Sequence, residues 1–268
     1  MNLGLENKII LVTGGAKGIG AGITRAFAAE GALVCILGRN PQDAADLIAE
    51  QSALGYRVES YRVEMTDEST IQEAVESIAA KHGRIDVIVN NAGVNDAVGL
   101  RHSIAAFQES LQKNIVSCFA LVHHTLDHLI ASRGVIINIG SKCSVTGQGG
   151  TSGYAASKGA MNALTREWAL DLCRYGIRVN CVIPAEVITP LYERWLEQAP
   201  DPIVARDQLE KTIPFGRRTT TIEEISDTTV FLASVRSSHT TGQLIFVDGG
   251  YVHLDRACTQ SASYLKGG

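Results

Sequence analysis

The sequence predicts an α/β protein, a single doubly wound domain in which a parallel sheet carries helices on both faces. Three observations lead to this prediction. Short apolar runs alternate with longer amphipathic segments along the chain. The short runs are apolar almost throughout, which is typical of parallel strands buried on both faces. No repeat, low-complexity tract or linker divides the 268 residues, so we expect one domain over residues 1–268.

Seven apolar runs are the expected strands of a seven-stranded sheet: residues 8–13, 33–37, 57–63, 86–90, 135–139, 178–183 and 244–247. Six amphipathic segments are the expected helices: residues 19–30, 41–54, 68–82, 103–132, 152–175 and 222–234. The interval 184–218 holds five of the six prolines and is expected to be irregular. A long irregular segment in a compact domain is usually functional, so we expect a substrate lid there, and a C-terminal tail over 249–268.

Composition excludes several classes of protein. With 45% hydrophobic and 19% charged residues the chain is not intrinsically disordered, and a net charge of −4 disfavours nucleic acid or an anionic membrane as partner. The longest apolar runs are far shorter than the roughly 20 residues that span a bilayer, and the first residues do not resemble a secretory signal. The six cysteines include no CxxC pair. We therefore expect a cytoplasmic protein with free thiols, no metal site and a small-molecule partner.

A glycine-rich loop, residues 13–20, lies between the first expected strand and the first expected helix. Glycines at 14, 18 and 20 allow a tight turn, a close approach of backbone to a pyrophosphate, and close contact of helix and strand. The helix N-terminus then faces the anion. A glycine cluster alone is a weak signal, but this position is the one that a dinucleotide-binding Rossmann fold requires.

The end of the second strand normally selects the cofactor, because an acidic residue there binds the ribose 2′-hydroxyl of NAD. Here the strand ends Leu37-Gly38-Arg39-Asn40, with no carboxylate. Arg39 can bind a 2′-phosphate through two hydrogen bonds, and Lys17 lies on the same side of the expected site. The alternative is that both are solvated surface cations. We predict NADP, with NAD possible.

Polar residues with catalytic chemistry cluster near the expected strand ends. Tyr154 and Lys158 stand four residues apart on one helix, and hence on one face. Ser141 follows the fifth strand, and Asn114 falls inside the long helix before it. Removing an alcohol proton while hydride leaves needs a base, and a tyrosine serves only if an adjacent cation makes it more acidic. Lys158 would supply that charge; the alternative is a plain surface pair.

Together these motifs resemble the short-chain dehydrogenase/reductase family over nearly the whole chain. The matching residues are Thr13-Gly14-x-x-x-Gly18-x-Gly20, Asn90-Asn91-Ala92-Gly93, Asn114, Ser141, Tyr154-x-x-x-Lys158, Pro184 and Thr189. The resemblance implies that Tyr154 is the general acid/base and that Lys158 also binds the nicotinamide ribose. Ser141 would then orient the reacting oxygen, and Asn114 would anchor a water relay.

The resemblance also implies a set of cofactor-binding positions: Gly14, Lys17, Gly18, Ile19, Gly20, Arg39, Glu64, Met65, Asn91, Ala92, Gly93, Tyr154, Lys158, Pro184, Val187 and Thr189. Two of these positions depart from the common pattern, since Glu64 and Met65 stand where the family usually has Asp-Val beside the adenine. No catalytic metal is implied, and we interpret His123, His124 and His128 as residues of ordinary helix surfaces.

The expected substrate-lining residues are mostly polar, with two aromatic rings: Asn95, Lys142, Gln148, Glu186, Tyr192 and Trp195. Aromatic faces suit the CH side of a sugar ring, whereas a steroid or fatty-acyl pocket should be largely apolar. Residues 189–192, 199–202 and 248–257 further resemble the branch of the family that contains L-fucose dehydrogenases. That resemblance implies oxidation of an aldose at C1 to the lactone, with L-fucose as the best candidate.

Two alternatives remain open from the sequence. A 3-oxoacyl or hydroxysteroid ketoreductase would share every catalytic residue, and a non-catalytic NADP-binding regulatory protein would share the fold. The helices expected at 103–132 and 152–175 carry more apolar residues than one sheet face could cover. In the family such helices pair across a two-fold axis, and the final strand forms a second interface. We therefore expect a homotetramer, in which the tail beyond Gly250 could reach a neighbouring active site.

Overall fold

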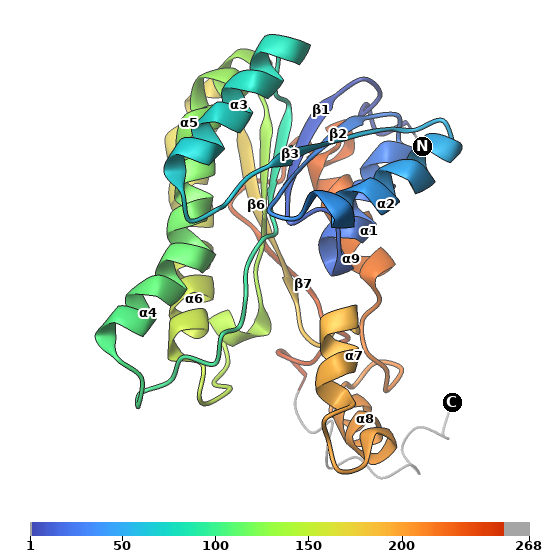
Figure 1. Cartoon of the computed structure of the whole chain (residues 1–268), viewed down its shortest axis with the longest axis vertical. Coiled ribbons are helices and arrows are strands. Elements are labelled where there is room, and N and C mark those ends of the chain that lie inside the picture. The colour runs from blue at the N-terminus through green and yellow to red at the C-terminus, as the bar shows by residue number, and fades with distance from the viewer. Residues whose placement is uncertain (1, 255–268) are drawn as a thin grey trace.

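The computed structural model describes residues 2–254, which build a parallel sheet between two helical layers (Figure 1). Within these residues the sheet has seven strands in the order β3-β2-β1-β4-β5-β6-β7, and every pairing is parallel. The strands are β1 (Ile9–Thr13), β2 (Leu33–Gly38), β3 (Arg57–Arg62), β4 (Val87–Asn90), β5 (Val135–Ile139), β6 (Arg178–Pro184) and β7 (Leu244–Val247). The predicted fold class is confirmed, and each strand lies within two residues of its expected bounds.

The helices divide into two layers that cover opposite faces of the sheet (Figure 1). One layer consists of α1 (Gly18–Ala29), α2 (Pro41–Ala53) and α9 (Ile222–Ala233). The other consists of α3 (Glu68–His82), α5 (Ser117–Ser132) and α6 (Ser152–Leu172), with α4 (Ile104–Leu111) beside α6. Two shorter helices, α7 (Pro190–Leu196) and α8 (Pro202–Lys211), lie beyond the end of the sheet at the bottom of Figure 1.

Two hydrophobic cores result from the alternation of side chains along each strand. In β1, Ile10 and Val12 point into the core beneath α1, α2 and α9, while Ile9 and Leu11 point into the core beneath α3, α5 and α6. All of β1, β4 and β5 are buried on both faces. This double burial explains why these strands read as continuous apolar runs in the sequence.

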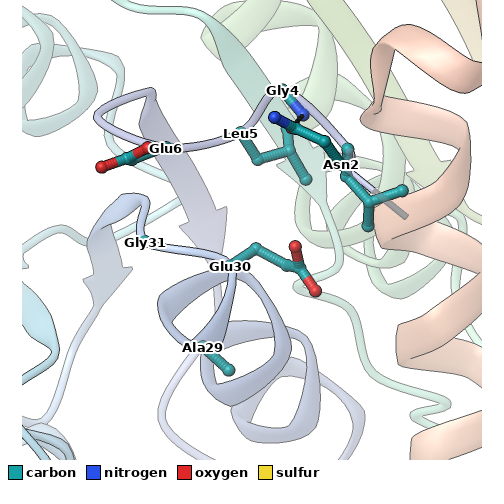
Figure 2. A pocket seen from close by; sticks show the side chains of 8 residues that line it. Asn2, Gly4, Leu5, Glu6, Ala29, Glu30 and Gly31 are labelled. Carbon is teal, nitrogen blue, oxygen red and sulfur yellow. Dashed lines mark hydrogen bonds between the residues drawn. The ribbon is translucent and has the colours of Figure 1, made fainter.

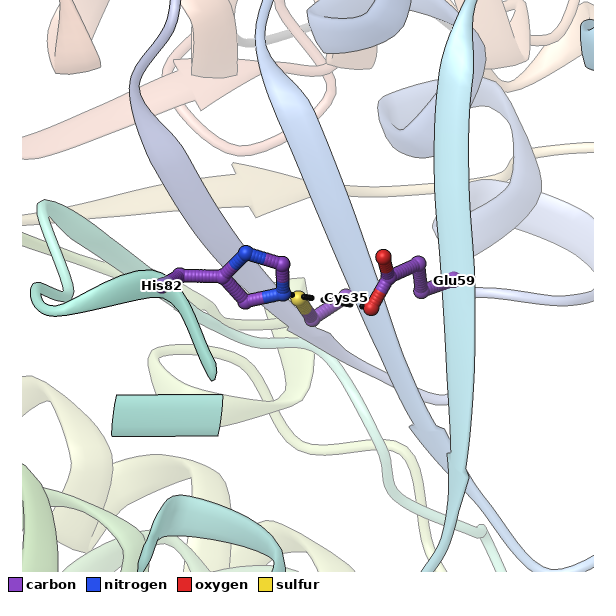
Figure 3. A group of neighbouring side chains, drawn as sticks. All are labelled: Cys35, Glu59 and His82. Carbon is purple, nitrogen blue, oxygen red and sulfur yellow. Dashed lines mark hydrogen bonds and ion pairs between the residues drawn. The ribbon is translucent and has the colours of Figure 1, made fainter. Parts of the chain in front are cut away.

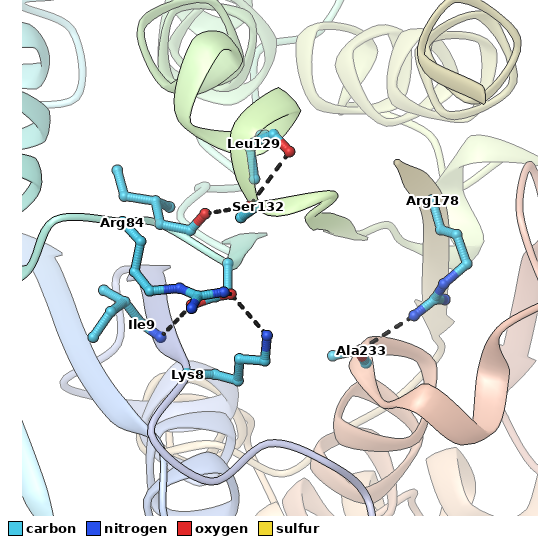
Figure 4. Close-up of polar contacts among 9 residues, drawn as sticks. Lys8, Ile9, Arg84, Leu129, Ser132, Arg178 and Ala233 are labelled. Carbon is cyan, nitrogen blue, oxygen red and sulfur yellow. Dashed lines mark hydrogen bonds and ion pairs between the residues drawn. The ribbon is translucent and has the colours of Figure 1, made fainter. Parts of the chain in front are cut away.

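The amino-terminal edge of the sheet is joined by polar contacts (Figure 4). Asp86, 3% exposed, lies just before β4 and accepts hydrogen bonds from Lys8 Nζ and from the backbone N–H of Ile9, each at 3.0 Å. Arg84 completes the ion-pair group. Across the sheet, the half-buried guanidinium of Arg178 donates to the carbonyl oxygens that end α9, Leu232 among them. These groups fasten the edge opposite to the one where open α/β sheets bind ligands.

The interval 184–218 is more ordered than the sequence suggested, because it contains α7 and α8. Its prolines begin these helices instead of preventing them: Pro190 and Pro202 occupy first-turn positions, where the missing N–H costs nothing. Thr189 and Asp201 cap the two helices through their side-chain oxygens. The expectation of an irregular segment is wrong here because a proline in the first turn of a helix does not break it.

The long helix expected at 103–132 is interrupted by a π-helical turn, Gln112–Val116, between α4 and α5. Among the described residues one stretch, Ile104–Ser132, is long and apolar enough to cross a membrane by composition alone, with a mean hydropathy of 1.2. One third of its most apolar window is buried within this chain. Its inner side carries the polar residues Asn114, Ser117 and Thr125, and α5 packs against α3. In this structure the stretch therefore belongs to the helical layer formed by α3, α5 and α6 on one face of the sheet.

Candidate active site

The glycine-rich loop after β1 is fastened to the loop after β4. Thr13 Oγ1 accepts hydrogen bonds from the backbone N–H groups of Asn91 and Ala92, each at 2.9 Å. The Asn91 side-chain amide donates in return to the carbonyl oxygen of Thr13 at 2.9 Å. These two loops lie where the strand order reverses between β1 and β4, which is where ligands bind in open α/β sheets.

The shape of this loop fits a pyrophosphate. Gly14 and Gly18 have φ angles of +62° and +53°, in the region that favours glycine. A Cβ on Gly20 would lie 2.2 Å from the carbonyl oxygen of Gly14, so no side chain fits there. α1 begins with no side-chain cap and no acidic residue in its first turn, so its N–H groups and positive dipole end are open to an anion. Ile19 packs against the core beneath.

Both cations predicted to select the cofactor have carboxylate partners. Lys17 Nζ lies 2.8 Å from Asp43, and Arg39 lies 3.7 Å from Glu64 Oε2. The Lys17 and Arg39 side chains are 69% and 78% exposed, so these ion pairs are solvated and weak. A Cβ on Gly38, just before Arg39, would meet no atom within 4 Å. The end of β2 therefore has open space at Gly38, and the two exposed cationic side chains, Lys17 and Arg39, are held only by weak ion pairs.

Asn114 lies in the π-helical turn, and its side chain is fixed by hydrogen bonds to backbone groups. Its Oδ1 accepts from the backbone N–H of Val94 at 2.7 Å, and its Nδ2 donates to the carbonyl oxygens of Val94 at 3.0 Å and Ser110 at 2.9 Å. A Cβ on Gly93 would lie 2.9 Å from Asn114 Oδ1 and 3.7 Å from Lys158 Nζ. Gly93 thus lets the loop after β4 lie close to both predicted catalytic residues.

Tyr154 and Lys158 project from the first turns of α6. Lys158 is 3% exposed, donates to the carbonyl oxygen of Ile139 at 2.7 Å, and has its Nζ 5.7 Å from the Tyr154 ring centroid. Ser141 lies two residues beyond β5, and its Oγ accepts from the backbone N–H of Cys143 at 3.3 Å. The structure therefore brings Lys158 to the ends of β4 and β5, together with Tyr154 on the same helix.

The segment after β6 returns to the glycine-rich loop. Pro184 is the last residue of β6, and Thr189 lies 3.4 Å from where a Cβ on Gly18 would stand. Val187 is buried and pairs with Thr220 through an isolated parallel bridge. Of the predicted cofactor positions after β3, Glu64 forms the ion pair with Arg39, while Met65 packs against the core.

Four side chains, which we call the Lys142 cluster, join the ends of neighbouring strands: Lys142, Glu186, Tyr192 and Tyr251. Lys142 Nζ contacts Glu186 Oε1 and stands 4.1 Å from the Tyr251 ring centroid. The Tyr192 hydroxyl donates to the other oxygen of Glu186 at 2.7 Å. Burial alone would lower the pKa of Lys142, but the hydrogen bond and charge of Glu186 outweigh it and raise that pKa. Burial and then the charge of Glu186 raise the pKa of Tyr192, which keeps its hydroxyl a donor.

The other predicted substrate residues lie farther out. Gln148 is exposed and accepts from the Cys143 thiol at 2.6 Å, and Asn95 is exposed and accepts from the backbone N–H of Ala97 at 3.3 Å. The Trp195 ring is 61% exposed and meets the Tyr192 ring edge-on at 5.4 Å between centroids. Of these three residues, Trp195 contacts the Lys142 cluster, through the ring of Tyr192.

Tyr251 is the member of this cluster that was not predicted as a site residue. Its position just after β7 was the available signal, since ligands bind beyond the carboxyl ends of parallel strands. Asp248 shapes this turn by accepting from the backbone N–H groups of Gly250 at 2.8 Å and Val252 at 2.9 Å. The expected tail over 249–268 lies outside the described residues from 255 onward.

A pocket lies at the opposite end of the sheet (Figure 2). It is lined by residues 2–6, which precede β1, and by residues 29–31, which precede β2. Both segments are at the amino-terminal edge, away from the predicted catalytic residues. This pocket is therefore separate from the candidate active site.

Cys35, Glu59 and His82 form a group with metal-ligating side chains between β2, β3 and the end of α3 (Figure 3). Glu59 is already occupied by Lys81 at 2.9 Å, by the Tyr61 hydroxyl at 2.9 Å and by His82 at 3.2 Å. Burial raises the pKa of the Cys35 thiol to about 12, which disfavours the thiolate that a metal needs. We interpret the group as a hydrogen-bonded structural cluster. The described cysteines are free, and all except the exposed Cys173 are buried.

Comparison with known proteins agrees with this geometry. A family model described as enoyl-(acyl carrier protein) reductase matches residues 14–252. The chain is 37% identical over 250 residues to a 3-oxoacyl-[acyl-carrier-protein] reductase of Thermotoga maritima, covering 92% of this chain and 99% of that protein. It is 38% identical over 245 residues to an L-fucose dehydrogenase of Oryctolagus cuniculus, covering 91% and 84%. The crystal structure of Cj0485 dehydrogenase superposes with a TM-score of 0.92 at 41% identity, covering 97% of this chain and 100% of that one.

Proposed function

Since the chain belongs to the short-chain dehydrogenase/reductase family, we propose that it oxidises an aldose at C1 to the lactone with NADP, and that L-fucose is its best candidate substrate. The observation that carries this proposal is the Lys142 cluster, which gathers polar side chains beyond the carboxyl ends of β5, β6 and β7. Family membership makes the chain an oxidoreductase, so the non-catalytic alternative is set aside.

In this proposal the residues around the ends of β4 and β5 move one proton. A nicotinamide dinucleotide held by the glycine-rich loop would supply the hydride acceptor for C1. Tyr154 removes the C1 hydroxyl proton, and the buried Lys158 ammonium, 5.7 Å from the ring centroid, stabilises the resulting phenolate by charge attraction. Ser141 orients the reacting oxygen. Asn114, fixed by three hydrogen bonds, positions the backbone of Val94 and holds the start of a water relay.

Cofactor binding is assigned to the residues predicted from the sequence. The loop of Gly14, Gly18 and Gly20 receives the pyrophosphate, while the exposed side chains of Arg39 and Lys17 leave their carboxylate partners for a 2′-phosphate. The carboxylates Glu64 and Asp43 lie beside these two cations. Because a carboxylate at this position can bind the ribose 2′-hydroxyl of NAD, NAD is the alternative cofactor. A comparison of kcat/KM for NADP and NAD tests this choice, and equal or better use of NAD contradicts it.

A ketoreductase acting on 3-oxoacyl thioesters is the second candidate, because the similarity to the Thermotoga maritima reductase is as strong as that to the L-fucose dehydrogenase. The two functions share the residues that move the proton. They differ in what the wall around the substrate must contact, a flexible apolar chain or a ring of hydroxyl groups.

One assay separates these functions. L-fucose, D-arabinose, L-galactose, D-glucose, L-rhamnose and a 3-oxoacyl thioester are offered to the wild type and to Tyr154→Phe. We expect oxidation of at least one aldose by the wild type, and a loss of kcat of about 10²- to 10⁴-fold in the variant with unchanged cofactor affinity. No activity on any aldose ends the sugar hypothesis, and substantial turnover by Tyr154→Phe refutes the assignment of the base.

We further propose that the enzyme works in the cytoplasm as a homotetramer. Free buried cysteines among the described residues support a reducing compartment. Exposed apolar residues on α5 and α6, Phe119 at 52% and Leu170 at 72%, support a helical interface between copies.

A further inference from the structure

The Lys142 cluster lies on the half of the sheet away from the glycine-rich loop. Lys142 follows β5, Glu186 follows β6 and Tyr251 follows β7, three strands adjacent in the sheet. The glycine-rich loop and the cations Lys17 and Arg39 follow β1 and β2 on the other half. A dinucleotide bound at those loops leaves the β5–β7 half for the substrate.

The charges of this cluster cancel where a substrate would meet them. The Lys142 and Glu186 side chains are only 12% and 10% exposed, so their ion pair is poorly screened by water. The Tyr192 hydroxyl donates to Glu186, and the face of Tyr251 covers the ammonium at 4.1 Å. A lone Lys142, with so little of its side chain exposed, would attract the carboxylate of a substrate bound beside it. Paired with Glu186, it presents no net charge.

The same pair still offers hydrogen bonds. An ammonium has three donors, and a carboxylate has about four acceptor sites, so neither is exhausted by the other. A hydroxyl group both donates and accepts, and adjacent hydroxyls match a surface on which a donor stands beside an acceptor. A carboxylate only accepts, and it would meet the like charge of Glu186.

We propose that Glu186 is a specificity-determining residue that, by neutralising Lys142, makes the site select uncharged polyhydroxy substrates and reject those bearing a carboxylate. The proposal rests on the proposed sugar-oxidising function and narrows it to neutral sugars. In this proposal Glu186 acts on substrates that carry a carboxylate by weakening their binding, in addition to any hydrogen bond that it forms with a neutral sugar.

The test uses two probes with the same carbon skeleton, L-threitol and L-tartrate, which differ in having terminal hydroxymethyl or carboxylate groups. Their binding to the wild type is measured by calorimetry with saturating cofactor present, so that tartrate cannot occupy the pyrophosphate loop. We expect the wild type to bind threitol more tightly than tartrate. Equal or tighter binding of tartrate by the wild type overturns the proposal without any variant.

Glu186→Gln keeps the shape of the side chain and removes its charge. We expect its affinity for L-tartrate to rise about tenfold or more, while its affinity for L-threitol changes less than about threefold. The matched control is Glu193→Gln on the exposed side of α7, which changes the net charge equally and should leave both affinities as in the wild type. The double variant Lys142→Gln/Glu186→Gln should lose the gained tartrate affinity.

Three outcomes contradict the proposal: no gain in Glu186→Gln, the same gain in Glu193→Gln, or a gain that persists in the double variant. Calorimetry does not depend on turnover. A wild type that oxidises no aldose therefore refutes the proposed function while the binding data still decide the role of Glu186.

Discussion

Gly20 shows how a single residue type can decide the shape of a turn. The position where its Cβ would stand is 2.2 Å from the Gly14 carbonyl oxygen and 2.6 Å from the Asn91 side-chain amide. The first obstacle is backbone, which cannot rotate away. The tight turn that presents N–H groups to an anion therefore exists only because this residue has no side chain.

Gly20→Ala is accordingly expected to weaken cofactor binding. Displacing the turn costs about 1–3 kcal/mol, which corresponds to roughly a 5- to 150-fold higher Kd if the whole cost falls on the bound state. Fluorescence titration with the reduced cofactor measures it. The control is Gly159→Ala in α6, where an added Cβ meets no atom within 4 Å, and equal affinities in the two variants would contradict the expectation.

At this scale the sequence predicted residues whose roles depend on short spacings. Tyr154 and Lys158 are four residues apart on one helix, and Gly14, Gly18 and Gly20 share one turn. Contacts between distant segments were not predictable, because the side-chain direction that brings Tyr251 over Lys142 depends on the turn shaped by Asp248.

At the scale of elements, α1 and α9 pack against each other, and Gly22 is where they meet. A Cβ on Gly22 would lie 2.1 Å from Ile222 Cγ2 and 2.8 Å from Ser226 Oγ. α1 starts at the glycine-rich loop after β1, so this contact with α9 also sets the position of that loop.

Gly22→Ala should therefore destabilise the protein, because overpacking of about 1–3 kcal/mol exceeds the roughly 0.5–1 kcal/mol that alanine gains over glycine in a helix. Urea unfolding measures the loss. Ile222→Ala removes the obstructing methyl group, so the double variant should lose less stability than the sum of the two single variants. Strictly additive stability losses would show that the added methyl group at position 22 does not clash with Ile222.

Helix and strand types were predictable because apolar periodicity differs between them, whereas α7 and α8 were not. In that segment the prolines suggest irregular backbone, but Pro190 and Pro202 directly follow the caps Thr189 and Asp201 and begin helices. The π-helical turn at 112–116 was equally hidden, because one additional residue in a helix leaves the local apolar pattern almost unchanged.

For the whole molecule, the sequence predicted the doubly wound sheet because the alternation of strands and helices with right-handed crossovers allows few topologies. It also predicted more apolar helix surface than one chain buries. Phe119 on α5 and Leu170 on α6 are both exposed, and the Phe119 ring lies 6.5 Å from that of Trp168 on α6. These helices are the expected seam between copies.

Small-angle scattering should therefore report a tetramer for the wild type and a smaller species for Phe119→Glu/Leu170→Glu, since charges would be buried at the seam. The control is Leu54→Glu, at the end of α2 in the other helical layer, where leucine is also exposed at 63%. A monomeric wild type would contradict the proposed assembly.

The two edges of the sheet differ in what they expose. β3 carries three charged residues that are exposed or half-buried, Arg57, Glu59 and Arg62, and such charges discourage a further strand from pairing. β7, Leu244–Val247, is half-buried along its length and carries no charge. The proposed homotetramer has its second interface at the final strand, so its dissociation would leave an apolar strand free to pair with another chain. Dilution or mild heating of this enzyme should therefore lead to aggregation that starts at the β7 edge and spares the β3 edge.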